Sequence, residues 1–250
     1  MENKKIAAIM LIIAITLSAL GLAYAHWSGT ATITGNIQMG TLTLAFDKSE
    51  APVANEYYWN TTLNDWETGE AEGKNVGSAT AKYKDAITDI HSGKDGWKTL
   101  EINITNAYPG YAVHTTWIPH NIGTVPLYIY GITLEGNKTK SDGSFVYHLL
   151  MNTTIQASGY MLGTIWEDVN NNGAIDPLVD KRIMELTIVD STFPLQLDPC
   201  QHDKGEFDLV FDEDAEMCHK YTLKFSLLAV QWDKLSEVYT APPPAPKAPP

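Results

Sequence analysis

Residues 27–39 read Trp27-Ser28-Gly29-Thr30-Ala31-Thr32-Ile33-Thr34-Gly35-Asn36-Ile37-Gln38-Met39. Every second position is apolar or glycine, and Ser, Thr, Asn or Gln stands between, which is the period of a half-buried β-strand. At Gly40 the phase changes, and Leu42, Leu44 and Phe46 carry the apolar face. A shift of one residue turns every side chain of a strand over. Gly40 therefore marks a bulge, a bend or a change of sheet between two successive strands.

The strand signal returns along the rest of the chain. Eight further segments alternate or are rich in β-branched and aromatic residues: 97–104, 111–118, 125–134, 145–155, 160–166, 181–189, 207–211 and 221–231. Turn residues such as Pro-Gly and Asp-Gly separate them. This pattern predicts an all-β fold, a jelly-roll-like β-sandwich with long loop insertions. The polar residues 47–75 predict a long loop between strands. The Ala- and Lys-rich residues 78–91 predict one or two helices.

The first 25 residues have the pattern of a secretory signal peptide. Lys4 and Lys5 precede an apolar run over 6–17, and Ala23-Tyr24-Ala25 forms a cleavage pattern before His26. The alternative is an uncleaved membrane anchor, since residues 6–22 nearly reach spanning length. We expect a secreted protein at the cell surface, without stable membrane association after cleavage. Its parts are a signal peptide (1–25), an N-terminal strand (26–39), a β-sandwich domain (40–240) and a Pro-rich tail (241–250).

The net charge of the chain limits the classes of partner that it can bind. There are 17 Lys and Arg residues against 30 Asp and Glu residues, a net charge of −13. Such a surface repels nucleic acid and anionic lipid headgroups and attracts cations. We therefore expect no nucleic-acid partner.

The expected location also bears on the cysteines and the sequons. In an oxidising compartment, Cys200 and Cys218 predict a disulfide that closes a short loop, and two free buried thiols are the alternative. Four N-x-S/T sequons are permissive for glycosylation and start at Asn60, Asn103, Asn137 and Asn152.

Three segments together resemble one family. They are residues 27–35 with Gly40-Thr41-Leu42, the stretch from Ile104-Thr105-Asn106-Ala107-Tyr108-Pro109-Gly110-Tyr111 into residues 119–126, and the closing strand 223–232. They look like the TasA/camelysin-type secreted fibre proteins, closest to the archaeal branch that forms bundling pili and cannula-type tubules. Residues 47–96 and 156–220 carry none of the resemblance. It implies a jelly-roll domain and polymerisation by donor-strand complementation.

The residues of the first strand support donation independently. An alternating strand beside a cleavage site can add to an exposed sheet edge, with Trp27, Ala31, Ile33 and Ile37 filling alternate pockets. The chain would then form a homopolymer, an extracellular filament or tubule. The alternative is an ordinary first strand folded into its own domain.

Residues 168–176 match the core of a calcium loop, D-x-N-x-N-G-x-I-D. Asp168, Asn170 and Asn172 supply side-chain oxygens, Ala174 a backbone carbonyl, and Asp176 a direct or water-mediated ligand. Val179 stands at the twelfth position in place of a bidentate Glu, so Asp180 or Glu167 would have to substitute. We expect calcium to assist assembly. The alternative is an Asn-rich turn whose side chains bond its own backbone.

We expect no enzymatic activity and name no catalytic residue. The sequence has no H-E-x-x-H, G-x-S-x-G, Walker or G-x-G-x-x-G element. The alternative function is a monomeric secreted β-sandwich that binds carbohydrate or attaches to a surface. Tyr57, Tyr58, Trp59 and Trp66 could stack on pyranose rings, or they could pack within a long loop.

Overall fold

The computed structural model of the chain describes residues 40–60, 65–69, 77–155, 161–188 and 193–238. The expected signal peptide, the N-terminal strand with Trp27, Ala31, Ile33 and Ile37, and the Pro-rich tail lie outside these ranges.

The described part is an all-β fold. Its first strands are β1 (Leu44–Phe46), β2 (Val53–Asn60), β3 (Asp65–Thr68), β4 (Ser78–Thr88), β5 (Asp95–Thr105), β6 (Tyr111–Trp117) and β7 (Pro119–Asn121). They are followed by β8 (Leu127–Lys140), β9 (Phe145–Ile155), β10 (Met161–Asp168), β11 (Lys181–Ile188), β12 (Leu195–Leu197), β13 (Gly205–Phe211) and β14 (His219–Gln231). Two single turns follow, η1 (Trp232–Lys234) and α2 (Leu235–Val238).

All eight strand segments expected after residue 90 are present, so the prediction of an all-β fold is confirmed. The helix expected within 78–91 is wrong, because these residues form β4, which pairs with β5 from Ser78–Thr105 to Thr88–Asp95. Residues 47–75 also hold the hairpin β2–β3, so they are not one long loop.

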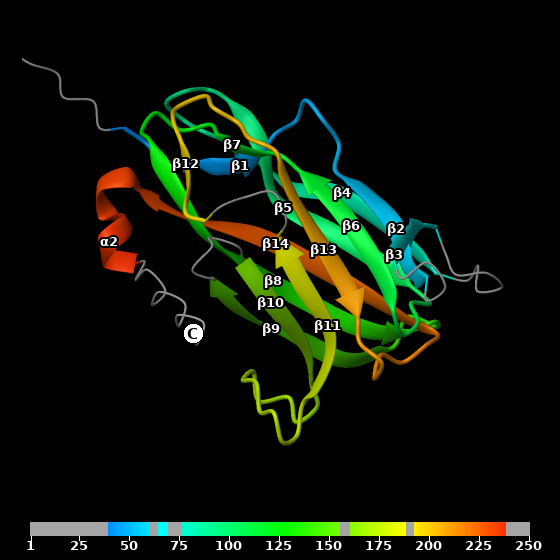
Figure 1. Cartoon of the computed structure of the whole chain (residues 1–250). Coiled ribbons are helices and arrows are strands. Elements are labelled where there is room, and N and C mark those ends of the chain that lie inside the picture. The colour runs from blue at the N-terminus through cyan, green and yellow to red at the C-terminus, as the bar shows by residue number, and fades with distance from the viewer. Residues whose placement is uncertain (1–39, 61–64, 70–76, 156–160, 189–192, 239–250) are drawn as a thin grey trace, which may run out of the picture. The chain divides into compact units, whose positions relative to one another are not determined.

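The strands form a single antiparallel sheet that curls on itself (Figure 1). Its order is β3-β2-β6-β13-β11-β10-β9-β8-β14-β5-β1-β7, with β12 added to β8 and β4 added to β5. The longest ladder joins β8 and β14, from Leu127–Gln231 to Lys140–His219. The curl brings β6, β13 and β11 over β5, β14 and β8, which gives the sandwich-like arrangement its interior.

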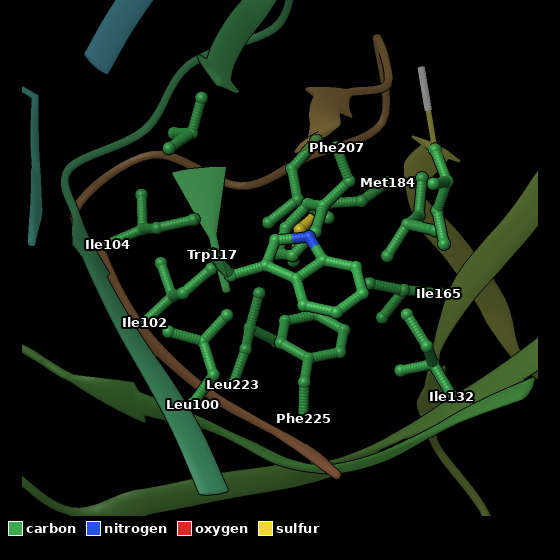
Figure 2. Packing of buried hydrophobic residues seen from close by; sticks show 14 of the residues in the cluster. Leu100, Ile102, Ile104, Trp117, Ile132, Ile165, Met184, Phe207, Leu223 and Phe225 are labelled. Carbon is green, nitrogen blue, oxygen red and sulfur yellow. The ribbon is translucent and has the colours of Figure 1, made fainter. Parts of the chain in front are cut away.

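The core lies between these two halves of the curled sheet. Trp117 of β6 and Phe207 of β13 meet Leu100, Leu223 and Phe225 of the opposite half (Figure 2). The rings of Phe207 and Phe225 lie 5.1 Å apart, centre to centre. Burial of each such side chain contributes about 1.5–3 kcal/mol relative to exposure, so these contacts are what hold the two halves together.

Two glycines shape this interior. Tyr111 N donates to Tyr108 O over 2.9 Å, and Gly110 between them has φ +78, which makes Tyr108–Tyr111 a type II turn. At Gly205, a Cβ atom would lie 2.4 Å from the ring of Trp117. Glycine at this position lets the buried indole pack directly against the β13 backbone.

Candidate functional site

The expected calcium loop connects β10 to β11 and projects from the lower edge of the sheet in Figure 1, in yellow-green. Asp168, at its start, is only 2% exposed. Its Oδ1 accepts the N–H of Asn172 at 3.1 Å, and its Oδ2 accepts that of Gly173 at 2.9 Å. Asn171 and Gly173 have positive φ, which turns the backbone back toward Asp168.

The other polar side chains of the loop also bond its backbone. Asn170 Oδ1 accepts the N–H of Asn172 at 3.1 Å, and Asn172 Oδ1 accepts that of Ala174 at 2.8 Å. Asp176 Oδ1 accepts the N–H of Leu178 at 3.1 Å. The oxygens therefore make the network of an Asx-turn loop, as the alternative interpretation anticipated.

Asp180 closes the loop. Its carboxylate accepts the N–H of Val169 at 3.0 Å and that of Asp176 at 2.6 Å, so it joins the two ends of the turn. It is 6% exposed. Among the described residues, no ion pair reaches Asp168 or Asp180, and each of these carboxylates is held by backbone N–H groups alone.

These residues fit a hard cation in their donor chemistry. Every candidate ligand is an oxygen, and a carboxylate oxygen that accepts one hydrogen bond keeps a lone pair for a metal. Within the described ranges, however, no three His, Cys, Asp or Glu side chains converge as a metal site on their own. A calcium ion would thus rely on Asp168 with the amide oxygens of Asn170 and Asn172 and the carbonyl of Ala174.

Glu167 forms a buried ion pair. Its carboxylate meets the ammonium of Lys138, with Nζ and Oε1 2.8 Å apart, and both side chains are at most 1% exposed. Lys138 Nζ also lies 2.7 Å from Glu216 Oε2. The hydrogen bond from Lys138 lowers the pKa of Glu216. Because Glu167 pairs with Lys138, the geometry favours Asp180 over Glu167 as the substitute for the missing twelfth ligand.

A second candidate site lies at the Gln231 end of β14, where one edge of the strand is open. β14 pairs with β5 only as far as Phe225–Leu100. From Ser226 to Gln231 it pairs with β8 alone, and no described strand pairs with its opposite edge. β1 stands across from this edge and meets β5 at the single pair Phe46–Trp97. Between them lies a cavity of ≈ 240 Å³, lined mainly by Leu42, Leu44, Phe46, Leu227 and Ala229. We call this the β14 groove.

No protein-family model, curated protein or solved structure matches this chain. None of the described helices is long and apolar enough to span a membrane.

The predicted disulfide does not form in this fold. Cys200 and Cys218 are both free and exposed. Cys200 N bonds Asn121 O, near the start of β8, whereas Cys218 adjoins His219, which pairs with the last residue of β8. At about 3.3 Å per residue, the ends of β8 are roughly 40 Å apart. A disulfide needs Cα atoms within about 7 Å, so the two thiols cannot meet in one chain.

The described sequons differ in access. Asn137 and Asn152 are exposed on β8 and β9, although Asn137 Oδ1 contacts His148 Nδ1 at 2.8 Å. Asn103 is half-buried, and its amide nitrogen donates to Glu101 at 2.9 Å. Asn60 ends β2. Asn137 and Asn152 are therefore the accessible sequons among those whose side chains are described.

Sequence reasoning missed Lys138 and the β14 groove. Lys138 stands in the polar run 135–140, where nothing marks it as buried. The groove depends on where β5 and β14 diverge, which is a tertiary property. The alternation of residues 221–231 signals a strand but not an open edge.

Proposed function

We propose that the mature chain is a structural subunit of an extracellular filament or tubule. In this proposal the N-terminal strand, residues 26–39, of one copy completes the sheet of the next copy. The expected signal peptide supports export, and the resemblance to TasA/camelysin-type fibre proteins supports this mode of assembly. The proposal predicts a homopolymer at the cell surface.

The observation that carries the proposal is the β14 groove. The edge of β14 from Ser226 to Gln231 offers backbone donors and acceptors that no described strand uses. Leu227 and Ala229 follow Phe225 on the core-facing side of β14, yet they are only partly buried. The groove thus combines an open strand edge with an incompletely covered stretch of core. An added strand would pair with the edge and cover the exposed core residues.

The N-terminal strand suits such a groove. Trp27, Ala31, Ile33 and Ile37 lie at odd positions and would share one face of an extended strand. That face would pack on the apolar lining, while Thr and Asn side chains faced outward. Pairing through the main chain would fix the strand between β14 and β1.

The donated strand and the β14 groove that would receive it are unlike surfaces, as a head-to-tail polymer needs. Gly40, where the N-terminal strand joins the domain, packs beside Val125, near the start of β8. The β14 groove lies along the same part of β8, since Gln231 pairs with Leu127 and Ser226 with Thr133. A contact between unlike surfaces whose rotation does not close a ring yields an open filament.

Electron microscopy of the mature chain 26–250 tests the proposal. We expect filaments or tubules from the wild type and few from Leu42→Glu, because a carboxylate on the groove lining would be buried by the incoming strand. Leu42 is 40% exposed in the subunit, so the variant should still fold. Val53→Glu is the matched control, since Val53 is 47% exposed and lies on β2, outside the groove. Monomeric wild-type protein would reject the proposal.

We further propose that calcium binds the loop and assists assembly. Two nearly buried carboxylates, Asp168 and Asp180, support this, since a cation would offset their charge. Asp168, Asn170, Asn172 and Ala174 would hold the ion, Asp176 would bind directly or through water, and Asp180 would fix the loop around it. When bound, the ion would supply a positive charge that ties the two ends of the loop together.

Calcium should raise the melting temperature. Binding to the folded state alone adds RT ln(1 + [L]/Kd), about 1.4 kcal/mol at ten times Kd, or roughly 3–6 °C for a domain of this size. Asp168→Asn with Asn170→Ala should remove most of this shift, because the amide carries no charge and its single oxygen can accept only one of the two loop N–H groups that Asp168 holds. Asp142→Asn is the control, since Asp142 accepts Ser144 N in an exposed turn. Equal melting temperatures of the wild type in calcium and in chelator would refute the site.

A further inference from the structure

The outer face of β2, β3, β6, β13 and β11 carries a second surface, which we call the aromatic face. Its residues line a depression of ≈ 390 Å³ on the side of these strands turned away from the core: Tyr57, Trp66, Ala112, His114, Thr187, Asp208 and Val210. It is separate from both the β14 groove and the calcium loop.

The strand register fixes these side chains as neighbours. Tyr57 stands beside Ala112, and Ala112 beside Val210, on three adjacent strands. One step along, His114 stands beside Asp208. Because the groups project from paired strands, their spacing is set by the sheet and changes little when a ligand binds.

The polar groups are oriented as well. His114 Nδ1 lies 2.7 Å from Asp208 Oδ1, and the Tyr57 ring meets the imidazole edge-on at 6.0 Å between centres. Asp208 is 38% exposed and His114 is 22% exposed at the side chain, and Trp66 is 40% exposed. A carboxylate, an imidazole and two aromatic rings therefore border one shallow depression.

This combination matches the two kinds of surface on a sugar ring. The C–H face of a pyranose packs on aromatic side chains, and its hydroxyls bond carboxylate and imidazole groups. Protein interfaces instead place apolar residues at the centre and polar ones at the rim. Here polar and aromatic groups alternate side by side, as the C–H and hydroxyl surfaces of a sugar chain do.

Charge selects among the glycans. Asp208 borders this surface, Glu206 lies next to it with its Oε2 3.8 Å from His114 Nε2 and its Oε1 paired with Lys204, and the whole chain carries −13. Anionic polysaccharides would be repelled. We propose that the aromatic face binds a neutral polysaccharide, an activity separate from polymerisation and independent of it.

Depletion assays with four insoluble neutral glycans test this proposal: β-1,4-glucan, chitin, β-1,3-glucan and α-1,4-glucan. We expect at least one of them to deplete the mature wild-type protein, and soluble polygalacturonate, which is anionic, to show no binding. With a hexasaccharide of the bound glycan, Trp66→Ala should raise Kd at least about tenfold, the equivalent of 1.4 kcal/mol. Trp66→Phe should recover part of the affinity, because it restores a ring.

Controls separate binding from folding and from assembly. Trp232→Ala removes a tryptophan that is 55% exposed outside the aromatic face and should leave Kd unchanged. Thermal melting accompanies each variant, and Trp66→Ala decides the outcome because its side chain is already exposed. No depletion by any of the four glycans would overturn the proposal. So would unchanged glycan binding by Trp66→Ala, including the case in which that variant stops forming filaments.

Discussion

A chain that lacks residues 26–36 is expected to be a folded, soluble monomer that forms no filaments. The ladders described for residues 40–238 do not include the deleted segment, so the sheet and its core should remain. The β14 groove of every copy would stay empty, because no copy could donate a strand. Size-exclusion chromatography, circular dichroism and electron microscopy of the deletion variant would measure all three properties.

A peptide of residues 26–39 adds a positive test of the same idea. It should bind the deletion variant and raise its melting temperature, since it can fill the groove without linking copies. A peptide of the same composition with the alternation scrambled is the control. Filaments of native appearance from the deletion variant would show that residues 26–36 do not join the subunits.

Lys138→Met is expected to be the most destabilising single substitution considered for this chain. Glu167 would remain 1% exposed without its cation, and breaking a buried ion pair from one side costs about 3–5 kcal/mol. For a domain of this size, that lowers the melting temperature by roughly 6–20 °C. Denaturant unfolding followed by tryptophan fluorescence, to which the buried Trp117 contributes, would measure the loss directly.

The matched variants identify the cause. Lys48→Met breaks an exposed pair, Lys48–Asp95 at 3.2 Å, and should cost no more than about 1 kcal/mol. Adding Glu167→Gln to Lys138→Met should restore much of the stability, because no buried charge would then lack a partner. Equal losses from Lys138→Met and Lys48→Met would contradict the assigned role of the buried pair.

The strands were predictable where a single period dominated the sequence. Residues 97–104 and 111–118 alternate clearly, and they became β5 and β6. Residues 78–88 were misread because Ala and Lys favour helices, although Ala79, Ala81 and Tyr83 alternate and pack on the core. The helix interpretation gave residue composition more weight than the alternation of apolar positions. In the structure, pairing with β5 makes these residues a strand.

The candidate sites were less predictable because they depend on contacts between distant residues. The loop 168–180 could be found from its local spacing. The Lys138 network joins residues from β8, β10 and the turn before β14, which no local pattern connects. The two cysteines are close in sequence, but β13 runs between them and carries the chain along the sheet. Sequence separation gave no measure of their separation in space.

The β8–β14 ladder makes the subunit mechanically anisotropic. Its 13 residue pairs run antiparallel, and Gly40 and Trp232 both leave the domain near the end where Leu127 meets Gln231. A pull that separates Leu127 from Gln231 would open the ladder from that end, breaking its hydrogen bonds in succession at low force. A pull along the strands, between that end and the Lys140–His219 end, would load all the bonds in shear at once. The same sheet would thus yield readily in one direction and resist strongly in the other.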